Sequence, residues 1–183
     1  SSSKLSVRLY NLTESFEEEE PLCRLTCHLV NVDGTDLTVE SEGVGVIDAL
    51  FNGMKERLAD QYPSLKSIDF SQFNIRGLIS VDDGPTTSDA EAEATVGIVN
   101  TEGVEFIFKS TAPSVSRAGM QATVDAAEYF VNSERTFVRL NEILEHYRSE
   151  GRTDLVEKYT DLMSRVVENT SYSAVVERIK NSM

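Results

Sequence analysis

The sequence is poor in cysteine and histidine. Its 183 residues hold two of each, Cys23, Cys27, His28 and His146. Cys23 and Cys27 share one face of a predicted strand while His28 points the other way, and this spacing matches no standard zinc pattern. Two cysteines also make no disulfide framework. We therefore expect buried core cysteines, no metal, no cofactor and a reducing, cytoplasmic location.

Long apolar segments and positive charge are also lacking. No apolar run approaches the roughly 20 residues that cross a bilayer, and the first four residues lack the apolar region of a signal peptide. Acidic residues outnumber basic ones 31 to 17, which gives a net charge of -14. Such a surface repels phosphate backbones and anionic lipid, so we expect no nucleic-acid and no membrane partner. Because the chain begins without methionine, a piece of a longer protein and a stand-alone module both remain open.

Sequence patterns of catalysis are missing as well. No Gly-x-Ser-x-Gly elbow is present to activate a serine. The acidic run at 17–20 lacks the ordered spacing of calcium ligands and indicates a solvated loop. With no convergent set of acid, base and nucleophile, the sequence predicts a protein that is not an enzyme by itself.

What the sequence does contain is one pattern twice. The segment Val-Asn-Val-Asp-Gly at 30–34 returns as Val-Asn-Thr-Glu-Gly at 99–103, 69 positions later, and matching alternation continues after both copies. Each copy predicts three strands and then a helix. In the first copy Leu5, Val7 and Leu9 alternate with polar residues, and apolar residues take helical spacing from Ile47 onward. The pattern is typical of an α+β fold with two pseudo-symmetric βββα units packed sheet-and-helix.

The predicted boundaries follow from this repeat. The two units span 5–62 and 69–147 and together form one domain at 1–147, while 152–183 forms an appended helical extension after Gly151. Within that extension the apolar spacing predicts helices at 154–169 and 173–181. Neither unit can bury both faces of its sheet alone, so we expect the units to pair within a chain or between chains.

The junction between the third strand and the first helix, 43–51, reads Gly-Val-Gly-Val-Ile-Asp-Ala-Leu-Phe. It resembles the Gly-x-Gly-Pro-x-Asp-Ala-Leu segment of the C-terminal regulatory domain of 2-isopropylmalate and citramalate synthases. Asp69-Phe70 is similar to the Asp-Tyr pair that opens that family's second unit, Asp89-Ala90 to its Asp-Ala-Gln-Ala segment, and 112–118 to the start of its second helix. Val46 replaces the family's proline, and the Gly-x-Gly before the second helix is missing.

This resemblance implies a function. In that family the domain binds the end-product amino acid, leucine or isoleucine, between the two units, forms homodimers, and lowers the activity of a separate acetyl-CoA-dependent acyltransferase barrel. That barrel holds a metal partly through a His-x-His pair, which this chain lacks, so we expect the barrel to be absent. The expected role is an allosteric module that senses a branched-chain amino acid for feedback control. The alternative is a ligand-free dimerisation or scaffold protein of the same fold.

A free amino acid presents a carboxylate, an ammonium group and a side chain. Glycines at a helix start let backbone N–H groups approach the carboxylate, carboxylates pair with the ammonium group, and apolar residues surround the side chain. The candidate ligand-binding residues are Gly43, Gly45, Ile47, Asp48, Phe70, Asp89, Ala90, Ser114 and Ser116. For each a structural role stays open: a turn for the glycines and Asp89, a first-turn acid for Asp48, core for Ile47, and helix caps for the serines.

Overall fold

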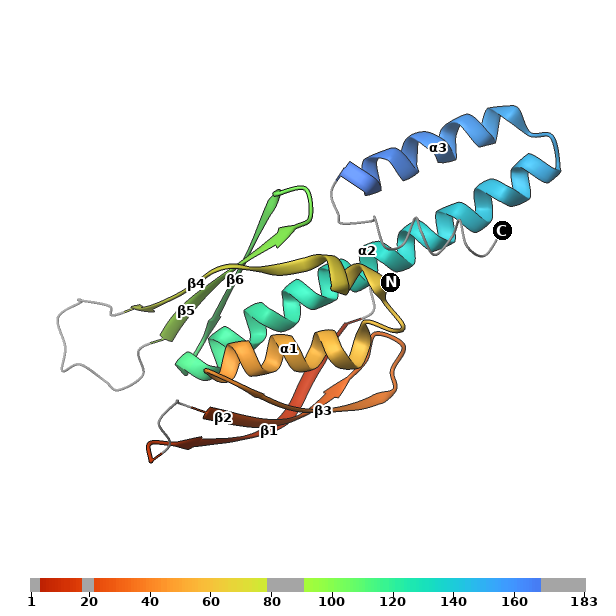
Figure 1. Ribbon diagram of the computed structural model, residues 1–183. Coiled ribbons are helices and arrows are strands. Elements are labelled where there is room, and N and C mark those ends of the chain that lie inside the picture. The colour runs from red at the N-terminus through yellow and green to blue at the C-terminus, as the bar shows by residue number, and fades with distance from the viewer. Residues whose placement is uncertain (1–3, 18–21, 79–90, 169–183) are drawn as a thin grey trace.

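The computed structural model describes residues 4–17, 22–78 and 91–168 of the chain (Figure 1). They form two three-stranded antiparallel sheets, each followed by a helix, and a further C-terminal helix, which confirms the α+β class and the βββα repeat. The first unit comprises β1 (Ser6–Ser15), β2 (Leu22–Val30), β3 (Asp36–Gly43) and α1 (Val46–Leu58). The 3-10 helix η1 (Pro63–Ser67) connects it to β4 (Ile68–Leu78), β5 (Glu91–Asn100), β6 (Glu105–Ala112), α2 (Val115–Ser149) and α3 (Thr153–Glu168).

The repeat in the sequence is a repeat in space. The third strands begin at Asp36 and Glu105 and the helices at Val46 and Val115, in both cases 69 positions apart. The first strands are related by 63 positions, because Ser6 pairs with Val30 and Asp69 with Val99. The second copy therefore has six more residues between its first two strands. The second strands, the third strands and the helices of the two units are all 69 positions apart.

Each first strand carries a β-bulge at the equivalent place. In β1 the register shifts between Val7 and Leu9, and in β4 between Phe70 and Gln72. The extra residue turns the following side chains to the opposite face. Leu9, expected on the inner face, is therefore 57% exposed and lies opposite His28. That expectation was wrong because simple alternation cannot show a bulge.

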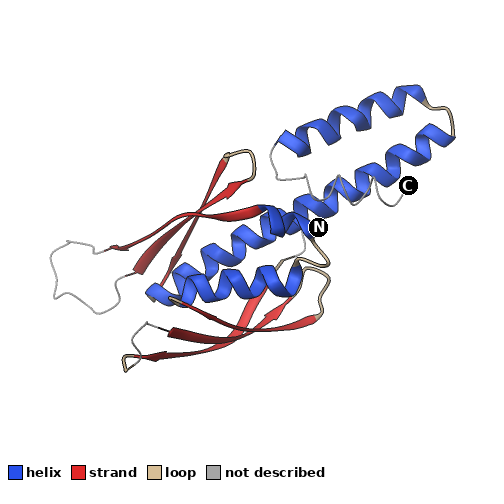
Figure 2. Cartoon of the chain, in the orientation of Figure 1, coloured by secondary structure: helices blue, strands red, loops and turns tan. Residues whose placement is uncertain are grey.

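The two helices lie between the two sheets (Figure 2). α1 packs on β2 and β3, and α2 packs on β5 and β6, while the two helices also contact each other. Figure 1 shows α1 and α2 side by side and starting at the same end of the molecule. The largest fully buried side chains come from both units and include Leu25, Leu50, Met54, Ile98 and Phe130. Pairing of the units within one chain thus covers the inner face of each sheet.

The second helix is much longer than the first. α2 has 35 residues and extends past the sheets, where it forms an antiparallel hairpin with α3 (Figure 1). Gly151, with φ of 68°, provides the turn, and Tyr147 stacks on Tyr159 with ring centroids 5.5 Å apart. The helix expected at 154–169 is confirmed as α3. The helix expected at 173–181 lies outside the described residues.

Candidate functional site

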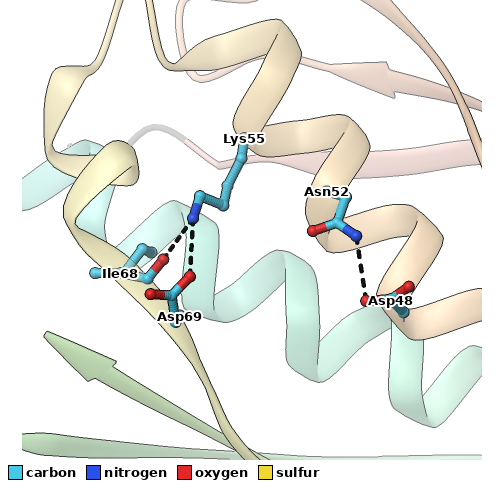
Figure 3. Close-up of polar contacts among 5 residues, drawn as sticks. All are labelled: Asp48, Asn52, Lys55, Ile68 and Asp69. Atoms are coloured by element: carbon cyan, nitrogen blue, oxygen red, sulfur yellow. Dashed lines mark hydrogen bonds and ion pairs between the residues drawn. The ribbon is translucent and has the colours of Figure 1, made fainter. Parts of the chain in front are cut away.

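The junction between β3 and α1 is a tight turn held by Asp48. Asn52 Nδ2 donates to Asp48 Oδ1 over 3.1 Å (Figure 3). The Val44 N–H donates to Asp48 Oδ2, also over 3.1 Å. A Cβ added to Gly43 would lie 2.6 Å from Asp48 Oδ2 and 2.7 Å from the Ala49 nitrogen. Because there is no room for that carbon, Gly43 is required by the turn itself.

Gly45, the N-cap of α1, is a different case. Its φ of -155° and ψ of 173° are extended backbone that any residue adopts, and a Cβ there would meet nothing within 4 Å. No side chain of the described residues caps the α1 N-terminus. The N–H groups of a helix's first turn point out of its end and carry a partial positive charge. Neither packing nor backbone conformation requires glycine here, and the missing side chain leaves these donors open to approach.

The equivalent junction of the second unit is capped from within. Ser114 is the N-cap of α2, and its Oγ accepts a hydrogen bond from the Arg117 N–H over 3.2 Å. Ser114 is exposed, while Ser116 in the first helical turn is partly buried. The structure therefore gives Ser114 a capping role. At this position the second unit has the hydroxymethyl side chain of Ser114, and the first unit, with Gly45, has no side chain.

The two helix starts meet around an apolar contact. Ile47, in the first turn of α1, is 7% exposed. A Cβ added to Gly119 of α2 would lie 2.7 Å from Ile47 Cδ1 and 3.2 Å from Phe73 Cζ. Phe73, from β4, stays 45% exposed although it faces inward opposite the buried Val96. Phe73 is not among the site residues expected from the sequence, since only the packing of α2 against α1 brings it to Ile47.

Phe70 lies further along α1. Its ring packs on Phe51 with centroids 4.2 Å apart, one helical turn after Ile47. Beside it, Lys55 Nζ donates to the Ile68 carbonyl over 2.7 Å and pairs with Asp69 over 3.2 Å (Figure 3). Phe70 thus joins the packing between β4 and α1 and is not at the helix start.

The structure brings four of the predicted site residues together in one turn, Gly43, Gly45, Ile47 and Asp48. It places Ser114 and Ser116 at the start of the neighbouring helix α2. Asp89 and Ala90 lie outside the described residues. Their contribution to the site remains a prediction from the sequence.

The two thiols are buried in the first sheet. Cys23 and Cys27 are 1% and 0% exposed, which confirms them as core residues. Burial raises the pKa of the Cys27 thiol to about 11. Burial also raises the pKa of Cys23, with a smaller contribution from the negative charge of Glu14. Neither thiol is a ready nucleophile at neutral pH, because both stay protonated.

Two further findings concern the described ranges 4–17, 22–78 and 91–168. They contain no group of three or more histidine, cysteine, aspartate or glutamate side chains that could hold a metal ion. None of their helices is long and apolar enough to span a bilayer.

Comparison with known proteins identifies the family. The family model of the LeuA allosteric (dimerisation) domain matches residues 8–131, which cover both βββα units up to the middle of α2. No curated protein matches the chain. The match includes the β3–α1 turn and the two helix starts described above. The chain belongs to the LeuA allosteric (dimerisation) domain family, a regulatory and dimerisation module and not a catalytic domain.

Proposed function

We propose that this module senses a branched-chain amino acid, leucine or isoleucine, and serves feedback control of branched-chain amino-acid biosynthesis. The observation that carries the proposal is the open start of α1 at Gly45. A receptor for a free amino acid needs a site for a carboxylate, one for an ammonium group and one for an apolar side chain. All three chemistries are present where α1 begins.

The carboxylate would bind the N–H groups of the first turn of α1. A side chain at position 45 would stand in its way, and glycine provides none. α1 and α2 start at the same end of the molecule, so the partial positive charges of both helix ends act on the same region (Figure 1). This arrangement favours an anion near Gly45.

The other two groups of the ligand have partners nearby. The Asp48 carboxylate accepts two hydrogen bonds within the turn and keeps lone pairs for an ammonium group. Asp89, which lies outside the described residues, is the second candidate for this role. The half-exposed Phe73 ring beside Ile47 offers an apolar surface to an aliphatic side chain.

Under this proposal the chain works in the cytoplasm, as a homodimer, and regulates an acyltransferase barrel that is joined to it or bound by it. A second candidate is a dimerisation scaffold that has lost its ligand. Two observations favour this alternative: Asp48 is already engaged in the turn, and Ser114 caps its own helix. These two contacts leave fewer hydrogen-bonding groups available to bind a ligand.

Ligand titration separates the two candidates. The melting temperature and the heat of binding would be measured with leucine, isoleucine and valine, with lysine as the control ligand. An amino acid at about 100 times its Kd stabilises the fold by roughly 2.7 kcal/mol, a shift of several degrees. The sensor predicts this shift for one branched-chain amino acid and its loss in Gly45→Val. Neither heat nor shift with any of the four would reject the sensor and leave the scaffold.

A further inference from the structure

A groove of about 570 Å³ lies between β6, α2 and the end of α3. Phe108, Tyr129 and Val166 form its apolar walls, and Asp125 and Glu128 bring two carboxylates to it. It lies at the border of the family module, because the family match ends at position 131 of α2 and α3 follows later. The groove is thus a feature of the extension and its junction with the module.

The aromatic wall of the groove is held firmly. The Tyr129 ring contacts Phe106, Phe108 and Phe130 with centroid distances of 5.9, 5.6 and 5.3 Å. Phe130 is fully buried. Rings fixed in this way present a preformed apolar surface, which binds a partner at a low entropic cost.

We propose that the chain's own C-terminal segment, residues 169–183, binds in this groove as a third helix of the extension. The segment lies outside the described residues. Its sequence places Tyr172, Val175, Val176, Ile179 and Met183 at positions i, i+3, i+4, i+7 and i+11, the spacing of one apolar helix face. A helix of about 12 residues is marginal in water by itself, so this face needs a surface to pack on.

The C-terminal end of α3 lies beside the groove. Val166 lines the groove and α3 ends at Glu168, so the segment begins at the groove's rim and needs no linker. The residues at 169–173 are Asn-Thr-Ser-Tyr-Ser, which are rich in turn and N-cap types. They suit a chain that ends α3 and starts a new helix.

Charge favours the same pairing. The segment 169–183 carries Arg178 and Lys180 against Glu177, a positive balance in a chain whose net charge is -14. The groove is lined by the carboxylates of Asp125 and Glu128 and by one cation, Arg165, so the charge of its lining is negative on balance. Opposite charge across an interface selects and orients the partner.

Hydrogen exchange of the full chain tests this proposal, independently of whether an amino acid binds. We expect amides at 174–181 to exchange at least about tenfold more slowly than in an unstructured peptide. Val176→Asp should remove that protection and also speed exchange in α2 at 125–136 and in the last turn of α3. Ala174→Asp adds the same charge on the opposite face of the helix and should change neither.

The contrary outcomes are equally clear. Unprotected amides at 174–181 would overturn the proposal, and so would a loss of protection in Val176→Asp that leaves 125–136 unchanged. Equal effects of Val176→Asp and Ala174→Asp would show that no defined face is bound. Protection that vanishes when a dimer dissociates on dilution would assign the groove to a second copy and overturn docking within the chain.

Discussion

At the scale of single residues, the two halves of the molecule differ most where their helices start. Gly45 and Ser114 occupy equivalent N-cap positions, and only Ser114 supplies a capping hydroxyl. A serine in place of Gly45 has room for its side chain and an allowed backbone conformation. The residue at 45 therefore decides whether the first turn of α1 is closed by the protein or open to a ligand.

Gly45→Ser should separate stability from ligand binding. The new hydroxyl would cap α1 as Ser114 caps α2, so the free energy of unfolding should stay equal or rise by a few tenths of a kcal/mol. The shift in melting temperature with a branched-chain amino acid should disappear, because the hydroxyl takes the donors that the carboxylate needs. Urea unfolding and thermal melts with and without leucine measure both effects. Ser114→Gly, the reverse change, is the control; a full ligand shift in Gly45→Ser would contradict the site.

Cys27 should make the protein less stable in alkali. Burial raises the pKa of its thiol from 9.0 to about 11 in the folded state, so between these values the unfolded chain loses a proton that the folded chain keeps. Stability from this group is therefore full below pH 9 and falls as the pH rises. By pH 10 the loss amounts to roughly 1 kcal/mol.

Urea unfolding at pH 8 and pH 10, in reducing buffer, measures this loss. Cys23, Tyr62 and Tyr129 also have raised pKa values, so the fold weakens in alkali for more than one reason. The test is the difference between the parent chain and Cys27→Ala, which should lose about 1 kcal/mol less between the two pH values. An identical loss in both proteins would show that the thiol ionises equally in both states.

At the scale of elements, α2 binds both ends of the first unit through carboxylates. Glu128 Oε2 accepts from the Leu5 N–H over 2.7 Å at the start of β1, and Glu134 Oε2 accepts from the Ser64 N–H over 2.9 Å in the connector η1. Glu134 is 3% exposed. Backbone donors that would otherwise be buried without a partner are satisfied by a helix of the other unit. The long α2 therefore organises the whole module and not only its own sheet.

Glu134→Ala should destabilise the fold by about 1–3 kcal/mol, since it leaves the buried Ser64 N–H without its acceptor. Glu134→Gln keeps an acceptor oxygen at the same distance from the backbone and should cost less. Glu142→Ala, on an exposed position of the same helix, should change the free energy of unfolding by under about 0.5 kcal/mol. Urea denaturation of the three variants checks the order. An equal loss of unfolding free energy in Glu134→Ala and Glu142→Ala would show that the hydrogen bond from Ser64 to Glu134 does not stabilise the fold.

The sequence was sufficient to predict the strands and helices, but it did not predict the local irregularities within them. Period-2 and helical patterns predicted the strands and helices because burial on one face imposes them locally. The bulge that turns Leu9 outward depends on how β1 pairs with β2, which no local pattern records. The contiguous turn of Gly43, Gly45, Ile47 and Asp48 could be found from spacing. Phe73 could not, because its approach to Ile47 requires the packing of two units.

At the scale of the whole molecule, the packing of the two units against each other buries the inner faces of both sheets and leaves other apolar surface exposed. Val44 is 73% exposed, Val115 56% and Phe73 45%, and all three lie where α1 and α2 begin. Val138, 37% exposed, lies instead on the part of α2 that forms the hairpin with α3. A dimerisation module buries apolar surface against a second copy. These are two of the regions that expose such surface; a third is β6 and the turn before it, where Ile107 is 45% and Val104 43% exposed.

The end near the helix starts is the better dimer surface, because its exposed valines lie next to the candidate ligand site and belong to the part that the family model matches. Val115→Glu should raise the Kd of the dimer by at least about tenfold, a loss of about 1.4 kcal/mol. The fold itself should tolerate this glutamate, since an acid in the first turn of α2 suits the helix dipole. Val138→Glu adds the same charge on the hairpin and should leave the Kd unchanged. Sedimentation equilibrium measures the dimer Kd of both variants. If only Val138→Glu dissociates the dimer, the interface lies on the hairpin of α2 and α3.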